Sequence, residues 1–170
     1  VALPLSIRRE RQSCIRDREN ITRLRLNVET VVADATEWKP AQPLDAILLD
    51  APCSASGTAR RHPDVLWIKR PRDITALKEG QIRLLEAAFQ MLKPGGRLIY
   101  AVCSLQEEEG PAQIESARQI GFKPVPFTEE ELQDMREART PEGWSRTHPG
   151  LWLEQGSMDG FFAVLFIKPA

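Results

Sequence analysis

Two cysteines and two aspartates directly follow apolar, strand-like runs, and these residue types can carry out nucleophilic and acid–base chemistry. Cys53 stands three residues after Asp50, just behind one such run, and Cys103 follows another. Asp34 follows a third. Ligands of open α/β sheets bind beyond the carboxyl ends of the strands. If the three strands are neighbours, both thiols and both carboxylates converge on one edge of the sheet.

Each of these residues also has a purely structural explanation. Asp34 and Asp50 could cap helices that follow them, and a cysteine is commonly a small buried hydrophobic residue. We expect burial for Cys14, on the apolar side of a predicted helix. Packing explains little about Cys53, which sits in a loop of Pro, Ser and Gly. Cys103 is expected at a strand-to-helix junction, where a helix N-terminus would lower the thiol pKa and favour the nucleophilic thiolate.

The elements that position these residues alternate between apolar runs and helical patterns, which is typical of an α/β fold with a largely parallel sheet. Helices are predicted over residues 7–25 (Ser6 as N-cap, Ile15 and Leu24 beside Cys14), 74–92 and 107–119, with a short surface helix over 128–139. Strands are predicted over 28–33, 45–50, 98–102 and 161–167. The continuous apolar run over 45–50 favours a strand buried on both faces. The run Lys93-Pro94-Gly95-Gly96 should end the helix before it.

Composition narrows the class of protein. The 170 residues match one ordinary domain, and a net charge of -1 excludes a globally polycationic nucleic-acid binder while allowing a local basic patch. The longest apolar run, Phe161–Ile167, is too short to span a bilayer, and no signal peptide is visible. Three widely spaced cysteines argue against a disulfide framework and a structural zinc site. We expect a cytoplasmic protein with free thiols and no metal.

Several motifs occur together in this chain. They are Asp50-Ala-Pro-Cys-Ser-Ala-Ser-Gly-Thr, Arg61-His-Pro-Asp, Trp67, Leu92-Lys-Pro-Gly-Gly, Tyr100-Ala-Val-Cys-Ser, Glu107-Glu-Glu and Asp159-Gly-Phe-Phe-Ala. Together they resemble the RNA cytosine-5 methyltransferases of the Sun (Fmu) type, and among these the bacterial members that act on 16S ribosomal RNA. The resemblance implies the class I S-adenosylmethionine-dependent methyltransferase fold, a Rossmann-like, doubly wound α/β sheet with an antiparallel final strand, here truncated at the N-terminus.

The resemblance also implies a role for each site residue. Cys103 would add to carbon 6 of cytosine, so that carbon 5 can attack the methyl group of S-adenosylmethionine. Cys53 would help to remove the proton from carbon 5 and release the enzyme by elimination. Asp50 would hydrogen-bond the cytosine edge and stabilise the activated ring. Contacts with the cofactor S-adenosylmethionine are implied for Asp34, Asp50 and Pro52.

A basic stretch beside Cys53 is a candidate RNA surface. Five Lys or Arg and a single acid lie between Arg60 and Arg72, with His62 and Trp67 among them. Such a stretch can bind phosphate, although a run of charges is often only a solvated face. The residues expected to bind RNA are Arg60, Arg61, His62, Lys69 and Arg70.

The chain departs from the family pattern near its N-terminus. No glycine precedes Gly57, so the glycine-rich cofactor loop is absent, and Pro4 stands where the ribose-binding acid is expected. We therefore expect residues 1–170 to form a single C-terminal part of a methyltransferase catalytic domain, inactive when assayed alone. The alternatives are a non-catalytic RNA-binding or scaffolding fragment, and a methyltransferase-like protein that has lost activity through Pro4.

The same departure bears on strand pairing. The absent segment normally supplies a strand between those that begin at Val1 and at Asp45. Unpaired backbone groups on such strands favour association. We expect the two strands to pair directly, or the chain to associate with another chain, which includes self-association.

Overall fold

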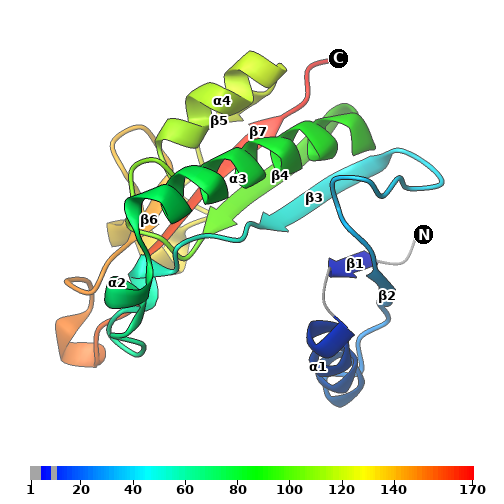
Figure 1. Ribbon diagram of the computed structural model, residues 1–170. Coiled ribbons are helices and arrows are strands. Elements are labelled where there is room, and N and C mark those ends of the chain that lie inside the picture. The colour runs from blue at the N-terminus through cyan, green and yellow to red at the C-terminus, as the bar shows by residue number, and fades with distance from the viewer. Residues whose placement is uncertain (1–4, 9–10) are drawn as a thin grey trace. The chain divides into compact units, whose positions relative to one another are not determined.

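The computed structural model describes the backbone of residues 5–8 and 11–170, and the side chains of residue 15 and of residues 17–170 (Figure 1). Pro4 and the side chain of Cys14 lie outside the described part. The chain divides into two compact units, Val1–Ala41 and Gln42–Ala170. Each unit is built from its own sheet and helices.

The first unit is a strand–helix–strand unit. Strand β1 (Leu5–Arg8) pairs in parallel with β2 (Glu29–Val32), and helix α1 (Arg11–Arg23) lies between them in sequence. The helix predicted over 7–25 therefore begins too early. Ser6 is not its N-cap, because Ser6 and Ile7 belong to the ladder, where Ile7 lies opposite the β-branched Val31.

The apolar helix face expected beside Cys14 is also wrong for the two residues whose side chains are described. Ile15 and Leu24 are each more than half exposed. Helix α1 is predominantly polar, with charged residues at six of its 13 positions. Its apolar residues are too few to form a continuous stripe.

The second unit contains a five-stranded sheet with the order β3, β4, β7, β5, and with β6 also paired to β7. Its strands are β3 (Leu44–Asp50), β4 (Leu92–Val102), β5 (Lys123–Val125), β6 (Ser145–Thr147) and β7 (Phe161–Ile167). Strands β3 and β4 are parallel, whereas β7 is antiparallel to β4, β5 and β6. The antiparallel final strand is confirmed with its predicted bounds. This sheet is mostly antiparallel, because β7 contacts three strands.

Among the described residues, strands β1 and β3 belong to two separate sheets, one in each unit, so the expected pairing or association of these strands stays a prediction. Strand β3 is not buried on both faces. Its residues alternate, so that Ile47 and Leu49 pack against the core while Leu48 is 72% exposed. Among the described residues of the second unit, β3 pairs with β4 alone and lies at the edge of the sheet.

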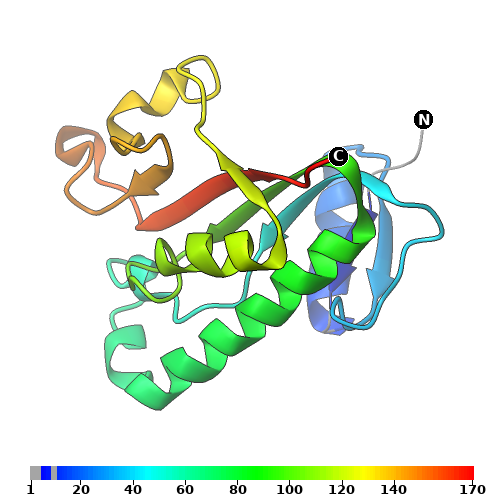
Figure 2. The same ribbon diagram turned by 90° about the horizontal axis from the view of Figure 1, so that it is seen from above.

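Two helices lie side by side on one face of this sheet, α3 (Pro71–Met91) and α4 (Ala112–Ile120) (Figures 1 and 2). Helix α3 begins before the predicted residue 74, because Pro71 starts it and the Asp73 carboxylate accepts the Arg70 backbone N–H. Helix α4 begins later than the predicted residue 107. Residues 107–110 form turns instead, which changes the surroundings of Cys103.

Shorter elements complete the second unit. They are helix α2 (Val65–Ile68) and the 3-10 helices η1 (Ser56–Thr58), η2 (Gln133–Ala138) and η3 (Leu153–Gln155). The surface helix predicted over 128–139 is thus a shorter 3-10 helix. Its neighbour Leu132 is buried against the sheet. No helix among the described residues is both long and apolar enough to cross a membrane.

The Lys-Pro-Gly-Gly run ends helix α3 as predicted, but strand β4 begins there rather than at residue 98. The pairing with β3 passes from Leu44 opposite Leu92 to Ala46 opposite Arg97, so the extra residues form a bulge. Gly95 has a φ of 79°, a conformation that favours glycine. The run is therefore both a helix stop and the irregular start of a strand.

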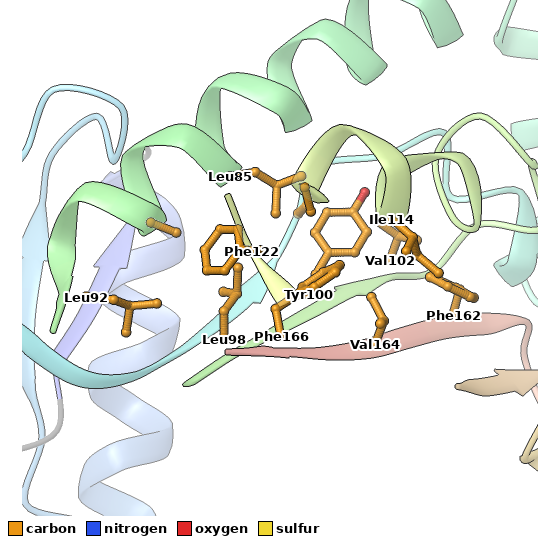
Figure 3. Packing of buried hydrophobic residues seen from close by; sticks show 13 residues of the cluster. Leu85, Leu92, Leu98, Tyr100, Val102, Ile114, Phe122, Phe162, Val164 and Phe166 are labelled. Carbon is orange, nitrogen blue, oxygen red and sulfur yellow. The ribbon is translucent and has the colours of Figure 1, made fainter. Parts of the chain in front are cut away.

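The main core lies between the sheet and helices α3 and α4 (Figure 3). Alternate residues of β4 and β7 point toward the helices, because successive side chains of a strand face opposite sides. The core residues drawn and labelled are Leu85, Leu92, Leu98, Tyr100, Val102, Ile114, Phe122, Phe162, Val164 and Phe166. The intervening residues face the other side, where Ile99 and Leu165 pack with Phe127. This packing fixes the ends of β3 and β4, from which the candidate site is built.

Candidate active site

The two cysteines predicted to share one edge of the sheet do meet. Asp50 pairs with Ala101 at the ends of the parallel strands β3 and β4, and the Ala51 N–H donates to the Ala101 carbonyl at 2.9 Å. The loops that follow therefore leave the sheet side by side. They bring the Sγ atoms of Cys53 and Cys103 to 3.5 Å, with both thiols free and half-buried.

The thiol pair is electrostatically unequal. The pKa of Cys103 is lowered to about 7, first because the Cys53 thiol donates a hydrogen bond that stabilises the Cys103 thiolate. Burial and the negative charge of Asp50 oppose this shift. The pKa of Cys53 is raised, because its proton is held by Cys103 and because the thiol is buried.

The low pKa expected for Cys103 is confirmed, but its expected cause is wrong. The sequence predicts a helix that begins at residue 107, shortly after Cys103, whereas helix α4 begins only at Ala112. The neighbouring thiol takes the place of the helix terminus. The sequence predicts that the two thiols share one edge of the sheet, but it does not predict the hydrogen bond between them.

Replacing Cys53 by alanine should raise the pKa of Cys103 toward the ordinary thiol value of about 8.5. The thiolate is the reactive form, so alkylation of Cys103 by iodoacetamide should lose its half-maximum near pH 7 and require higher pH. At pH 7 the rate should fall roughly fifteenfold, because a pKa about 1.5 units above the pH leaves only about 3% of the thiol as thiolate instead of about half. Mass spectrometry of the Cys103 peptide measures the rate. An unchanged midpoint in Cys53→Ala would show that Cys53 does not stabilise the thiolate.

The predicted carboxylates and Pro52 are placed differently from one another. Asp50 and Pro52 are exposed at the end of β3, beside the thiol pair. Asp34 follows β2 in the first unit, where its Oδ1 accepts hydrogen bonds from the Thr36 N–H at 3.0 Å and the Thr36 hydroxyl at 2.6 Å. It closes a turn there, as the capping alternative suggested, although no helix follows. The structure thus brings Asp50 and Pro52 together with the thiols.

A buried carboxylate to which the sequence assigns no role lies behind both cysteine loops. Glu109 is fully buried and accepts hydrogen bonds from the Ser54 N–H at 2.8 Å and from the hydroxyls of Ser54 and Ser104, each at 2.6 Å. The side-chain amide of Gln81 also donates to it, at 3.4 Å. The Glu107-Glu-Glu motif pointed to this region. The burial of Glu109 is not predicted, because the sequence indicates a helix over residues 107–119.

A backbone contact ties the Cys53 loop to the start of β7. The Gly57 N–H donates to the Cys103 carbonyl at 3.1 Å, and the Gly160 N–H donates to the Gly57 carbonyl at 2.8 Å. A Cβ atom at Gly57 would lie 1.9 Å from the Gly160 carbonyl oxygen. Glycine at position 57 therefore allows two backbones to touch beside the thiols.

Part of the basic stretch is held by an acid of the same unit. Arg61 donates its Nε–H to Asp159 at 2.6 Å and forms a second contact with the same carboxylate, and Arg60 lies 3.5 Å from it. These arginines lower the pKa of Asp159, with the hydrogen bond from Arg61 as the main cause. Their contacts with Asp159 hold the loop in place. Both guanidinium groups nevertheless remain substantially exposed to solvent.

The rest of the basic stretch surrounds helix α2. His62, Lys69 and Arg70 are exposed, and in the described part of the chain Lys69 and Arg70 form no side-chain ion pair. Trp67 is 87% exposed. This loop therefore presents cations and an aromatic ring together. The described residues hold no cluster of His, Cys, Asp and Glu that could bind a metal ion.

The chain is similar in sequence to one protein family and to individual proteins from several bacteria. The model of the family 16S rRNA methyltransferase RsmB/F matches residues 5–167. The ribosomal RNA small subunit methyltransferase B of Vibrio cholerae is 39% identical over 162 residues, which are 90% of this chain and 33% of that protein. The protein of the same name from Yersinia pseudotuberculosis is 38% identical over 167 residues, 96% of this chain and 36% of its own length. The chain thus spans about a third of the length of these relatives.

A solved structure agrees with these relatives in fold. NSun6 from Pyrococcus horikoshii, crystallised with SFG, superposes with a TM-score of 0.80 at 27% identity. The match covers 99% of this chain and 42% of that one. The fold is that of class I S-adenosylmethionine-dependent methyltransferases, and the chain belongs to the 16S rRNA methyltransferase RsmB/F family.

Proposed function

We propose that the protein transfers the methyl group of S-adenosylmethionine to carbon 5 of a cytosine in RNA, with 16S ribosomal RNA as the substrate. The observation that carries this proposal is the pair of free thiols 3.5 Å apart at the ends of two parallel strands. One thiol is poised as a thiolate near neutral pH, and the other retains its proton. A reaction that needs one nucleophile and one proton-transfer group matches this pair.

In the first step Cys103 acts as the nucleophile. Its thiolate forms a bond to carbon 6 of cytosine, and the electrons of the carbon 5–carbon 6 double bond make carbon 5 electron-rich. Asp50 lies at the end of β3 with its carboxylate exposed, where it can hydrogen-bond the cytosine edge. Carbon 5 can then form a bond to the methyl group, while the bond between that methyl group and the sulfonium sulfur breaks and leaves its electron pair on sulfur.

In the second step Cys53 acts as the proton acceptor. The hydrogen bond to Cys103 is the main cause of the raised Cys53 pKa. Once Cys103 is bonded to carbon 6 it is no longer a thiolate, so this cause disappears and Cys53 can release its proton to solvent. The Cys53 thiolate removes the proton from carbon 5, the double bond re-forms, and the bond between Cys103 and carbon 6 breaks.

S-adenosylmethionine supplies an electrophilic methyl group on a sulfonium sulfur. The family resemblance assigns contacts with it to Asp50 and Pro52 of the second unit and to Asp34 of the first. These residues fit the cofactor in part. Carboxylates accept hydrogen bonds from amino groups, and the exposed Asp50 adjoins the thiol pair. Asp34 would take the adenine amino group.

We place the RNA on the loop around helix α2. Lys69, Arg70 and His62 would contact phosphates, and Arg60 and Arg61 would do so from their positions on Asp159. The exposed ring of Trp67 suits stacking on an unpaired base. We also propose that the protein works in the cytoplasm, where thiols such as Cys53 and Cys103 stay reduced.

The test is the product of the reaction. We expect the full-length protein, given methyl-labelled S-adenosylmethionine and unmodified 16S ribosomal RNA, to place the label in 5-methylcytidine after digestion to nucleosides. Label in another nucleoside would contradict the proposal. RNA binding without any transfer would favour a non-catalytic RNA-binding protein. For the 170 residues assayed alone we propose no measurable transfer. They contain no glycine before Gly57, so they have no glycine-rich loop whose backbone could approach the cofactor closely.

A further inference from the structure

We propose that Glu109 is a positioning residue whose buried carboxylate ties the Cys53 loop to the Cys103 loop and sets the separation of the two thiols. The inference rests on the proposed function for its catalytic meaning. It concerns a residue that touches neither thiol and for which the sequence suggested no role.

The donors to Glu109 come from three segments of the chain. Ser54 directly follows Cys53 and donates both its backbone N–H and its hydroxyl, at 2.8 and 2.6 Å. Ser104 directly follows Cys103, and its hydroxyl donates at 2.6 Å to Oε2, the oxygen that also accepts the Ser54 hydroxyl. Gln81 reaches the other oxygen from helix α3 at 3.4 Å. One carboxylate thus binds the residue after each cysteine.

The chemistry of the network requires an acceptor at this position. Ser54, Ser56 and Ser104 lie within 3.1 to 3.3 Å of one another, and the Ser56 hydroxyl accepts the Leu105 N–H at 3.0 Å. Since each hydroxyl carries one proton, those of Ser54 and Ser104 can both point at Glu109 only if its oxygen accepts. An ionised carboxylate is an acceptor at every lone pair, and such charge-assisted bonds are short.

The charge of Glu109 does not favour the thiolate. It raises the pKa of Cys103 and of Cys53, as one negative charge does near another. A carboxylate that opposes the reactive form of the nucleophile, and yet lies fully buried behind it, is explained by what it holds in place. Its contribution is the geometry of the pair, because misplacing a reacting group by about 1 Å can slow a reaction about a hundredfold.

The geometry can be measured without RNA or cofactor. Phenylarsine oxide forms two As–S bonds to a close pair of thiols and releases water, so its affinity reports whether Cys53 and Cys103 stay together. We expect Glu109→Gln, which keeps the shape and removes the charge, to weaken binding at least tenfold while the circular dichroism of the folded chain persists. Glu108→Gln is the matched control, since Glu108 is exposed and next in sequence; it should bind like the unsubstituted chain.

Two further measurements keep the proposal open to refutation. Should Glu109→Gln fail to fold, Ser104→Ala decides, with an expected loss of a few-fold in arsenical affinity. In the full-length protein, Glu109→Gln should lower kcat for methyl transfer about a hundredfold and leave KM for RNA unchanged. A folded variant with unaltered arsenical affinity would overturn the positioning role. Absence of methyl transfer in the unsubstituted protein would instead refute the proposed function, and the arsenical result would still decide the role of Glu109.

Discussion

Cys103→Ala should abolish methyl transfer by the full-length protein, whereas Cys53→Ala should trap the protein on its RNA. Without the Cys103 thiolate nothing adds to carbon 6, so neither product nor covalent adduct can form. Without Cys53, attack and methyl uptake can proceed, but the proton on carbon 5 has no acceptor. The bond between Cys103 and carbon 6 then persists, and a complex should survive denaturing electrophoresis.

The third cysteine provides the control for this experiment. Cys14→Ala should leave turnover unchanged and should form no adduct, because Cys14 belongs to the first unit and to neither loop of the thiol pair. Labelled RNA on the gel, followed by peptide mapping of the complex, identifies the attachment point. An adduct that persists in Cys103→Ala and vanishes in Cys53→Ala would reverse the two roles. If all three variants lost stability and none trapped RNA, the cysteines would be structural.

Among substitutions that add a single methyl group near the site, Gly57→Ala should be the most destabilising. The new Cβ would lie 1.9 Å from the carbonyl oxygen of Gly160, and both partners are backbone, so neither can move aside by rotating a side chain. Overpacking of this kind costs about 3 kcal/mol or more. For a chain of this size we expect the unfolding temperature to fall by roughly 6–12 °C.

Gly80→Ala is the matched control for this substitution. Gly80 lies inside helix α3, and the nearest atom to its added Cβ is a guanidinium nitrogen of Arg83 at 3.8 Å. Alanine in a helix interior should raise stability by about 0.5–1 kcal/mol. Thermal unfolding followed by circular dichroism measures both variants. Equal stability of Gly57→Ala and the unsubstituted chain would mean that the Gly57–Gly160 contact does not persist in solution.

Features that depend on local pattern could be predicted from the sequence. Strand β7 has its predicted bounds, helix α3 differs by a few residues at its ends, and the thiols of Cys53 and Cys103 meet because parallel strands end at one edge. These outcomes follow from apolar periodicity and from general rules of α/β sheets. Neither apolar periodicity nor these general rules depend on which residues far apart in the sequence are in contact.

Features that depend on distant contacts could not be predicted. The Glu107-Glu-Glu run has the composition of a solvated helix start, and the burial of Glu109 is decided by contacts with residues such as Ser54, which precedes it by 55 residues. The ion pairs of Arg60 and Arg61 depend on Asp159, which follows them by nearly a hundred residues. Such pairings are set by tertiary packing, which overrides local preference.

The contact between Gly57 and Gly160 also has a consequence for biosynthesis. The Cys53 loop leaves the ribosome long before Gly160 is translated, so a nascent chain can form the β3–β4 pair and still lack the backbone that closes over this loop. Long-range contacts of this kind form late, because the chain between them must first be ordered. A partly synthesised chain therefore carries both cysteines while the contact that holds the Cys53 loop against Gly160 is still missing.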